Sequence, residues 1–358
     1  MSSLAEGGSG EEDLVFPVAA DAPRASRVGF GPLRLSQLAR ASGLVGLVVL
    51  AGFVPSLAQS NYLTSIALQI EILMCLALGL NFVVGYAGML DLGFAAFFAI
   101  GAYTTGMLAV HAHWPILATL PPAVVIALIG AVFVGVPTLR LRSDYLAVVT
   151  LGFGEIIQTV VNNLNQTGGP EGIYGIPPLS LGGWTLTTTS SYYEIFLFLV
   201  VVFVAVSARI RHSRLGRAWL AIREDEDTAQ AMGIKVRRYK LYAYMAGSVF
   251  GSLTGSLYAP AFIAIAPPSF GFTESLLVVM AVSIGGIGSI WGALLGAGVV
   301  IAFPEVFRQF AQARLLVFGI ALVLVMVLRP QGVWPENGIG WRRLAARWLN
   351  RDAQSAPR

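Results

Sequence analysis

The chain has 358 residues, of which 56% are hydrophobic and only 12% charged, and its mean hydropathy is +0.73. Soluble globular proteins carry about 25% charged residues, so the composition excludes that class and indicates an integral membrane protein. The net charge of +4 does not indicate a nucleic-acid partner, because the basic residues cluster between apolar runs. A single cysteine, Cys75, excludes an internal disulfide and a cysteine-based metal cluster.

The first forty residues are poor in bulky apolar side chains. They combine Gly, Ser and acidic residues with four arginines and contain no hydrophobic core of the kind that a cleavable signal peptide needs. We expect residues 1–40 to form a disordered, basic cytoplasmic tail without a role in catalysis or transport.

Runs without charged residues predict the membrane spans, since about 20 apolar residues cross a bilayer. No Asp, Glu, Lys or Arg occurs in 41–70, 92–139, 241–273 or 275–304. The second run is long enough to cross twice, with its turn at residues 111–115, where Trp, His and Pro suit an interface. The prediction is an all-α, polytopic fold with about ten transmembrane helices, near residues 41–58, 62–84, 93–110, 116–138, 145–164, 193–209, 240–258, 272–287, 289–304 and 314–328.

The basic residues predict the orientation, because cytoplasmic loops retain Lys and Arg. Of the 23 Lys and Arg residues, 21 lie in the N-terminal tail, at 140–142, in 209–240 or in 329–358. Both termini are therefore expected in the cytoplasm, and residues 331–358 form a C-terminal tail. The loop 163–192 contains no Lys or Arg and is expected outside the cell. The transmembrane domain then covers residues 41–330.

The sequence lacks the motifs of most enzymes. There is no glycine-rich phosphate loop before either lysine, no nucleophile elbow, and no carboxylate spacing around the three histidines that would form a zinc site. We therefore expect no enzymatic activity, no cofactor and no metal. Transport is the function class that these absences leave.

Polar residues at membrane depth are candidates for a transport pathway, because burying them in hydrocarbon is costly. Glu155, Gln158, Thr159 and Asn162 recur at i, i+3, i+4 and i+7, which places them on one face of a helix. This face either lines an aqueous route or forms hydrogen bonds to neighbouring helices. Glu71 is a further pathway candidate, although for Glu71 and for Glu274 alone a packing role is favoured.

Glycines between 285 and 298 form a second pattern. Gly292 and Gly296, with Ala293 and Ala297, make a ridge of small residues that permits close helix packing. A broken or re-entrant helix near 285–288 is the alternative.

The largest basic loop, 209–240, contains a predicted helix over 216–233, within an element that covers 213–234. It either docks on a cytoplasmic protein or lies on anionic lipid, but acidic residues at 224–227 would be repelled by a lipid surface. For docking we expect apolar contacts from Ala221, Ala229 and Met232. The charged side chains of Arg217, Arg223 and Glu224 are expected to fix the register at the rim. Gly233 is expected to cap the C-terminus of the helix.

Six segments in order resemble the LivM-type permeases of branched-chain amino acid ABC importers, and together they cover roughly residues 60–335: 81–103, 139–157, 167–173, 215–234, 285–297 and 329–335. The resemblance implies a heterodimer with a second, related permease, two cytoplasmic ATPase subunits, and an extracytoplasmic binding protein. It also implies that 215–234 is the ATPase-coupling region, although this segment lacks the literal Glu-Ala-Ala of importer loops.

The expected function is that of an importer permease in the bacterial plasma (inner) membrane. It would form half of the translocation pathway for branched-chain amino acids or related small solutes, and partner ATPases would supply the energy. Membrane lipid would surround it, and no nucleic-acid partner is expected. The alternative is an ion-gradient-driven secondary transporter that is complete in one chain.

Overall fold

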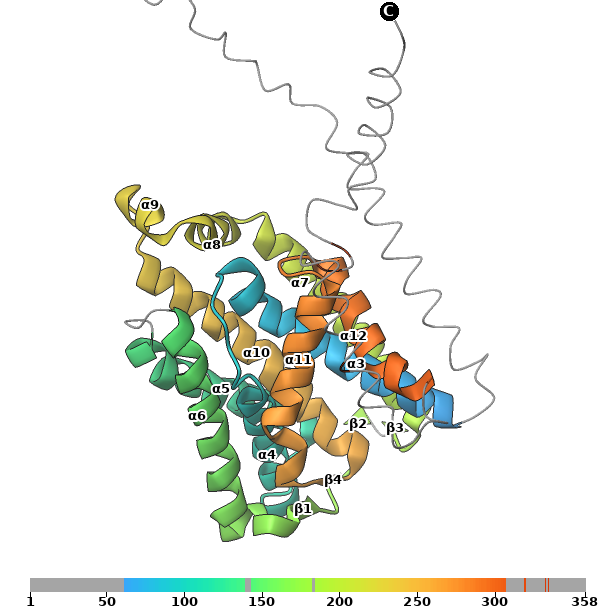
Figure 1. Ribbon diagram of the computed structural model, residues 1–358. Coiled ribbons are helices and arrows are strands. Elements are labelled where there is room, and N and C mark those ends of the chain that lie inside the picture. The colour runs from blue at the N-terminus through green and yellow to red at the C-terminus, as the bar shows by residue number, and fades with distance from the viewer. Residues whose placement is uncertain are drawn as a thin grey trace, which may run out of the picture. The chain divides into compact units, whose positions relative to one another are not determined.

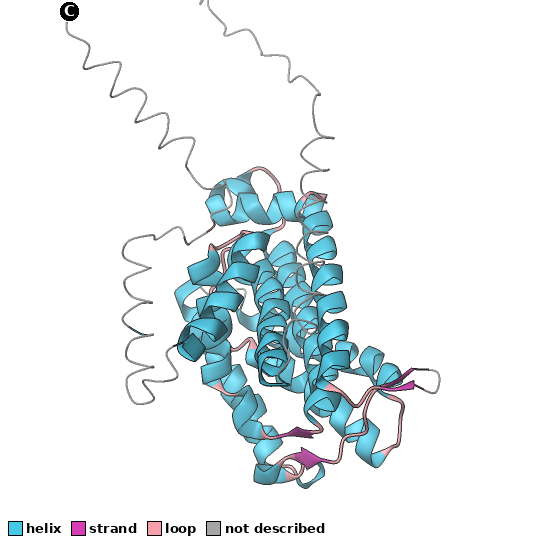
Figure 2. Ribbon diagram, turned by 90° about the vertical axis from the view of Figure 1, so that its right-hand side faces the viewer, coloured by secondary structure: helices cyan, strands magenta, loops and turns pink. Residues whose placement is uncertain are grey.

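The computed structural model describes residues 61–138, 143–181 and 184–306, together with the single residues 319, 332 and 334. The predicted spans near 41–58 and 314–328 and both predicted terminal tails lie outside these ranges. Figure 2 shows that helices dominate the part of the chain that is described. The prediction of a helical fold is confirmed for this part.

The helices follow one another along the chain and most run through the length of one bundle (Figure 1). Their bounds are α3 (Asn61–Leu80), α4 (Ala95–His111), α5 (Ile116–Thr138), α6 (Ser143–Asn163), α7 (Thr189–Arg211), α8 (Arg214–Glu224), α9 (Glu226–Ala231), α10 (Val236–Phe262), α11 (Phe272–Gly285) and α12 (Ile290–Val306).

Five helical segments of the described chain are long and apolar enough to cross a membrane: Tyr62–Tyr86, Ile116–Thr138, Tyr145–Asn163, Thr189–Arg211 and Pro267–Gly285. Two shorter apolar helices, Ala95–His111 and Ile290–Glu305, accompany them. The chain is therefore a multi-pass membrane protein. Each span predicted between residues 62 and 304 coincides with a helix, and the predicted turn at 111–115 connects α4 to α5.

The two ends of the bundle are formed by different elements. Helices α8 and α9 cap one end, and the antiparallel two-residue strands β1 (Ile173–Tyr174) and β4 (Ala264–Ile265) lie at the opposite end (Figures 1 and 2). A second small pair, β2 (Ser180–Leu181) and β3 (Trp184–Thr185), belongs to the loop between α6 and α7.

The first helix of the bundle is broken. α3 continues into a π-helix, η1 (Asn81–Tyr86), after which residues 87–94 run without helical structure back into the bundle and enter α4. π-helical turns and unwound backbone are rare in membrane proteins except where protein or water surrounds them. The break therefore marks 81–94 as a candidate for function.

Helices α11 and α12 form a tight hairpin. A Cβ atom at Gly285 would lie 1.9 Å from the carbonyl oxygen of Gly292, and one at Gly296 would lie 1.9 Å from that of Ala281. Both alternatives from the sequence thus hold: the small residues pack two helices closely, and the chain breaks at 286–289 between them.

Candidate functional site

Helices α8 and α9 form a compact unit at one end of the bundle. The predicted single helix over 216–233 is wrong, because the backbone is extended at Asp225 (φ −158°, ψ 114°) and ends α8 there. The Asp225 carboxylate accepts a hydrogen bond of 2.6 Å from the backbone N–H of Thr228 and so caps α9. This hydrogen bond holds the pKa of Asp225 below its ordinary value.

The unit is fixed to the bundle by a small apolar core and one ion pair. Ile222 of α8, Ala229 of α9 and Val236 of α10 are buried together. Lys240 of α10 lies 2.5 Å from the carboxylate of Glu226 at the start of α9. The α8–α9 unit therefore moves with α10 and is not a free loop.

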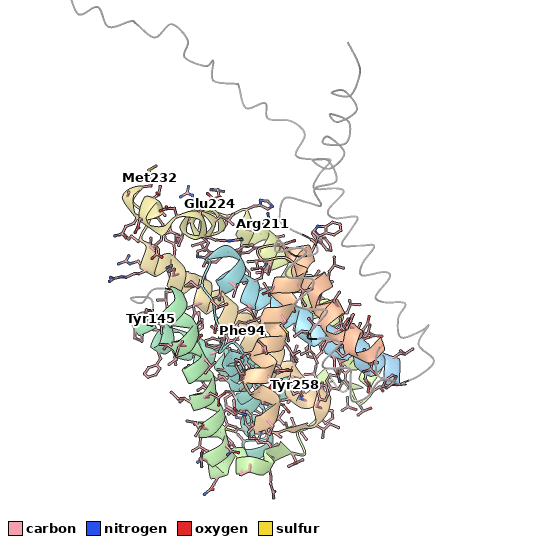
Figure 3. The ribbon with its side chains drawn as sticks, in the orientation of Figure 1. Phe94, Tyr145, Arg211, Glu224, Met232 and Tyr258 are labelled. Atoms are coloured by element: carbon pink, nitrogen blue, oxygen red, sulfur yellow. The ribbon has the colours of Figure 1, made fainter. Side chains whose placement is uncertain are left out.

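The predicted docking residues divide between the outside and the inside of this unit. Met232 is 80% exposed, and Figure 3 shows Met232 and Glu224 pointing away from the bundle. Arg217 is also exposed, Ala221 is half-buried, and Gly233 has the positive φ of 86° that ends α9. Ala229 is 4% exposed and packs inward, so it offers no apolar contact to a partner.

Arg223 is exposed on α8, and its guanidinium reaches back to the broken helix. Its Nη1 donates a hydrogen bond of 2.6 Å to the carbonyl oxygen of Gly85 in η1. A Cβ at Gly88, which has φ +69°, would lie 3.1 Å from Cγ of Arg223, so the arginine stem packs on the chain where it leaves η1. Trp219 of α8 packs edge-on against Phe82 of η1, with ring centroids 5.9 Å apart. The α8 helix thus holds the helix break directly.

The same break is joined to the α11–α12 hairpin. The side-chain oxygen of Asn81 accepts a hydrogen bond of 3.0 Å from the backbone N–H of Gly288. Gly288 lies in the turn of the α11–α12 hairpin, where backbone groups lack helical partners, and Asn81 is the first residue of η1. Helix α8, η1 and the 286–289 turn therefore form one connected unit.

Beyond η1, side chains satisfy the backbone of residues 87–94. The N–H of Leu92 donates to Oγ1 of Thr150 at 3.1 Å, and that of Gly93 donates to Asp91 at 2.8 Å. At the start of α4, the N–H of Ala95 donates to Oγ of Ser275 at 3.0 Å. Asp91 is fully buried, while Leu90 is 41% exposed. The segment is thus fixed by α6 and α11 and reaches the surface of the chain at Leu90.

Helix α6 lies at the edge of the bundle and has two kinds of exposed surface. One side is apolar and carries Tyr145, Val149, Ile156 and Val160, and Figure 3 shows Tyr145 pointing away from the molecule. The other side is the predicted polar stripe, on which Glu155, Thr159 and Asn162 are exposed and Gln158 is half-buried.

The polar side of α6 makes one hydrogen bond to a neighbouring element. Gln158 Nε2 donates to the carbonyl oxygen of Pro267 at 3.3 Å, in the short 3₁₀ segment Pro267–Phe270 before α11. Hydrogen bonds among the described residues therefore do not account for Glu155, Thr159 and Asn162. The structure brings the four α6 residues together on one face, as the sequence predicted, and places that face next to α11.

Glu71 and Glu274 lie elsewhere. Glu71 of α3 is 4% exposed and close to Tyr193 of α7, so it faces the interior of the bundle. Glu274 lies in the first turn of α11 and lines a cavity of about 360 Å³ between α3, α10, α11 and α12. No hydrogen bond or ion pair joins the Glu274 carboxylate to another of the described residues.

Residues 62–328 match the sequence pattern of a family described as the branched-chain amino acid transport system / permease component. The chain belongs to this family. It is 39% identical over 318 residues to the high-affinity branched-chain amino acid transport system permease protein LivM of Escherichia coli K12, covering 82% of this chain and 74% of that protein. No solved structure matches the chain.

Two more distant members of the permease family are also similar. The probable branched-chain amino acid transport permease protein LivM of Methanocaldococcus jannaschii is 26% identical, over 63% of this chain and 69% of that protein. The permease protein LivH of Salmonella typhimurium is 26% identical, over 72% of this chain and 89% of that protein. The family resemblance read from the six sequence segments is confirmed.

Sequence reasoning missed the residues through which this permease joins its helix breaks. Asn81, Thr150 and Ser275 are ordinary polar residues within apolar runs, and their partners lie far away in sequence. A signal was present around Asp91, where glycines at 85, 88 and 93 surround one acidic residue. That combination favours unwound backbone over a continuous span.

Proposed function

We propose that this chain is a permease subunit of an ABC importer and forms half of the translocation pathway for branched-chain amino acids or related small hydrophobic solutes. Its membership of the permease family, over residues 62–328, carries this proposal. The chain would catalyse no chemical reaction. Its partners would be a second permease of the same family, two cytoplasmic ATPases and an extracytoplasmic binding protein in the plasma (inner) membrane.

The orientation belongs to the same proposal. With α8 and α9 in the cytoplasm, the basic residues of 209–240 lie on the cytoplasmic side, as expected for retained Lys and Arg. The loop 163–192, with β1, then lies outside, where a binding protein would dock. Both termini would be cytoplasmic, with tails at 1–40 and 331–358, and the permease domain at 41–330 would contain about ten transmembrane helices.

The exposed polar side of α6 is proposed to line the pathway. Glu155, Thr159 and Asn162 belong to a helix long and apolar enough to cross a membrane and make no side-chain hydrogen bond to another of the described helices, and such residues do not face lipid. A second permease that covers this side would enclose them in an aqueous seam between the two subunits. Glu71 is not proposed for this role, since it faces the bundle interior.

The exposed side of the α8–α9 unit is proposed to dock on an ATPase. Met232 supplies an exposed apolar contact, and Arg217 and Glu224 are exposed on α8 at the same end of the bundle. Arg223 would transmit the movement inward through Gly85. ATP binding can then shift the conformational equilibrium of the permease through its differential affinity for two states.

Reconstitution in proteoliposomes tests the proposal. The chain is combined with a second permease, the ATPases and the binding protein, and ATP hydrolysis is measured with and without leucine and the binding protein. We expect hydrolysis and uptake to rise only when all subunits are present. Leucine uptake by the chain alone, abolished by an ionophore, would contradict the proposal and support a secondary transporter.

A further inference from the structure

The cavity beside Glu274 is separate from the α8–α9 unit and from the polar side of α6. It lies at the end of the bundle that carries β1 and β4, where α10 ends and α11 begins. Figure 3 shows Tyr258, one of its lining residues, in this part of the bundle. Its volume of about 360 Å³ is at the small end of the roughly 300–1,000 Å³ that ligand pockets occupy. It has the size for a small molecule.

One wall of the cavity is aliphatic. Leu73 and Leu76 of α3, Leu277 of α11 and Ile301 of α12 contribute to it. Branched side chains from three helices make a surface that favours a short, branched, apolar group through burial of apolar area. This wall alone does not select a ligand, because any small hydrophobic molecule could contact it.

The charge in the cavity supplies the selection. Glu274 is the one acidic side chain among the lining residues, and its carboxylate has no hydrogen-bond or ion-pair partner in the described part of the chain. A half-buried carboxylate without a partner among the described residues is stabilised by a cation that enters the cavity. The other polar groups of the lining, among them Gln69 and Thr273, are neutral donors and acceptors.

We propose that this cavity binds a small molecule with a primary ammonium group and a short aliphatic side chain, whose ammonium pairs with Glu274. For an aliphatic amino acid, the side chain would lie on the wall formed by Leu73, Leu277 and Ile301, and Gln69 or Thr273 would donate to the carboxylate. The inference rests on the proposed function and adds a specificity site within the permease, distinct from the binding protein.

Thiol protection tests this inference without ATP hydrolysis. Thr273→Cys is placed in a Cys75→Ala background and the full-length permease, assembled with its partner permease, is labelled with a methanethiosulfonate reagent. Two probes are added: 3-methylbutylamine, which retains the ammonium and side chain of leucine, and 4-methylpentanoate, which retains the carboxylate and side chain. We expect the amine to slow labelling and the acid to leave it unchanged.

Adding Glu274→Gln to the Thr273→Cys protein provides the decisive comparison. The amide keeps the size of the side chain and removes its charge, so protection by the amine should weaken about tenfold or more. Glu194→Gln is the matched control, since Glu194 is an exposed acid near the start of α7 and does not line the cavity. It should leave protection unchanged.

Several results would overturn the inference. Equal protection by amine and acid would mean that the cavity selects only the aliphatic group, and no protection would mean that neither probe enters. Protection that survives Glu274→Gln would also exclude the ammonium pairing. In each case leucine-stimulated hydrolysis by the wild-type complex would still stand, so failure of this inference is distinguishable from failure of the proposed function.

A second variant tests the aliphatic wall. Leu277→Ala enlarges the cavity next to Glu274, so protection by 3-methylbutylamine should weaken while protection by the larger 2-phenylethylamine should strengthen. An unchanged preference between the two amines would place the side chain elsewhere and contradict the proposed orientation.

Discussion

Arg223 links the proposed docking helix to the broken helix inside the bundle. It belongs to the helix proposed to contact an ATPase, and its guanidinium reaches the carbonyl oxygen of Gly85 in the broken helix. A hydrogen bond to a charged group typically contributes about 1.5–3 kcal/mol. We interpret Arg223 as a positioning residue that joins α8 to the interior of the permease.

Arg223→Gln should therefore uncouple the complex without dismantling it. We expect ATPase subunits to co-purify normally and basal hydrolysis to persist, while the stimulation by leucine and binding protein falls about tenfold or more, because the link to Gly85 is lost. Arg214→Gln is the control, since Arg214 is an exposed arginine at the start of the same helix and is not among the proposed docking residues. Ala221→Glu, by contrast, should prevent co-purification if α8 docks. Normal stimulation in Arg223→Gln would contradict the role of this residue.

The polar side of α6 gives the second prediction at this scale. Asn162→Leu removes an exposed amide at membrane depth while keeping a helix-forming residue. If the face lines the pathway, leucine uptake should fall several-fold while the assembled complex is recovered in normal amount. Ile156→Leu, on the apolar exposed side, should leave uptake unchanged. Normal uptake in Asn162→Leu, or loss of the complex, would assign the face to packing.

At the scale of elements, the break at Asp225 decides which side chains reach a partner. A continuous helix over 216–233 would place Ala221, Ala229 and Met232 along one side, as the sequence suggested. The cap at Asp225 instead turns α9 so that Ala229 joins the core with Ile222 and Val236 and Met232 points outward. In the sequence the acidic run 224–227 argues only against binding to lipid, although Asp is a favoured N-cap residue and Glu226 and Asp227 suit a first turn.

The Asp225 cap makes the stability of α9 dependent on pH. Its pKa is lowered by the Thr228 backbone N–H, so the stabilisation is present above the ordinary Asp pKa and is lost as the pH falls through the lowered value. Corrected for its intrinsic dependence on pH, hydrogen exchange of residues 226–233 should therefore stay slow at neutral pH and accelerate only in that acidic range. Asp225→Ala should accelerate it at neutral pH as well, while Asp225→Asn should retain most of the protection. Equal exchange in wild type and Asp225→Ala would exclude the cap as the stabilising contact.

At the scale of the whole molecule, hydropathy and charge predicted most of the described helices but not how they are interrupted. Runs without charges located α5 and α11 closely, because the bilayer sets the length of a span. The same criterion left residues 85–92 outside the predicted spans 62–84 and 93–110, but it did not show that this connection runs back into the bundle, since hydropathy measures side chains and not the pairing of backbone groups. The polar face of α6 was found from its helical period, whereas its exposure at the edge of the bundle depends on long-range packing.

The proposed orientation has a direct test. Cysteines placed singly at Ser180 and Thr188, in a Cys75→Ala background, should react with a membrane-impermeant thiol reagent in intact cells. Cysteines at Ser213 and Thr228, beside and within the α8–α9 unit, should react only after the cells are opened. Labelling of the second pair in intact cells would show that the orientation is opposite to the proposed one and that the α8–α9 unit lies outside the cell.

The unwound segment also has a consequence for biogenesis. The N–H groups of Leu92 and Ala95 receive their acceptors from Thr150 and Ser275, which are synthesised 58 and 180 residues later. The segment leaves the translocon with unsatisfied amides, which are costly in hydrocarbon. These amides lack their final acceptors until those helices enter the bilayer. Residues 87–94 must therefore wait in water, in the interface or as transient helix, and take their final position only after α11 has been made. A ribosome stalled before Ser275 would hold the part of the permease that precedes this residue, inserted but not yet folded.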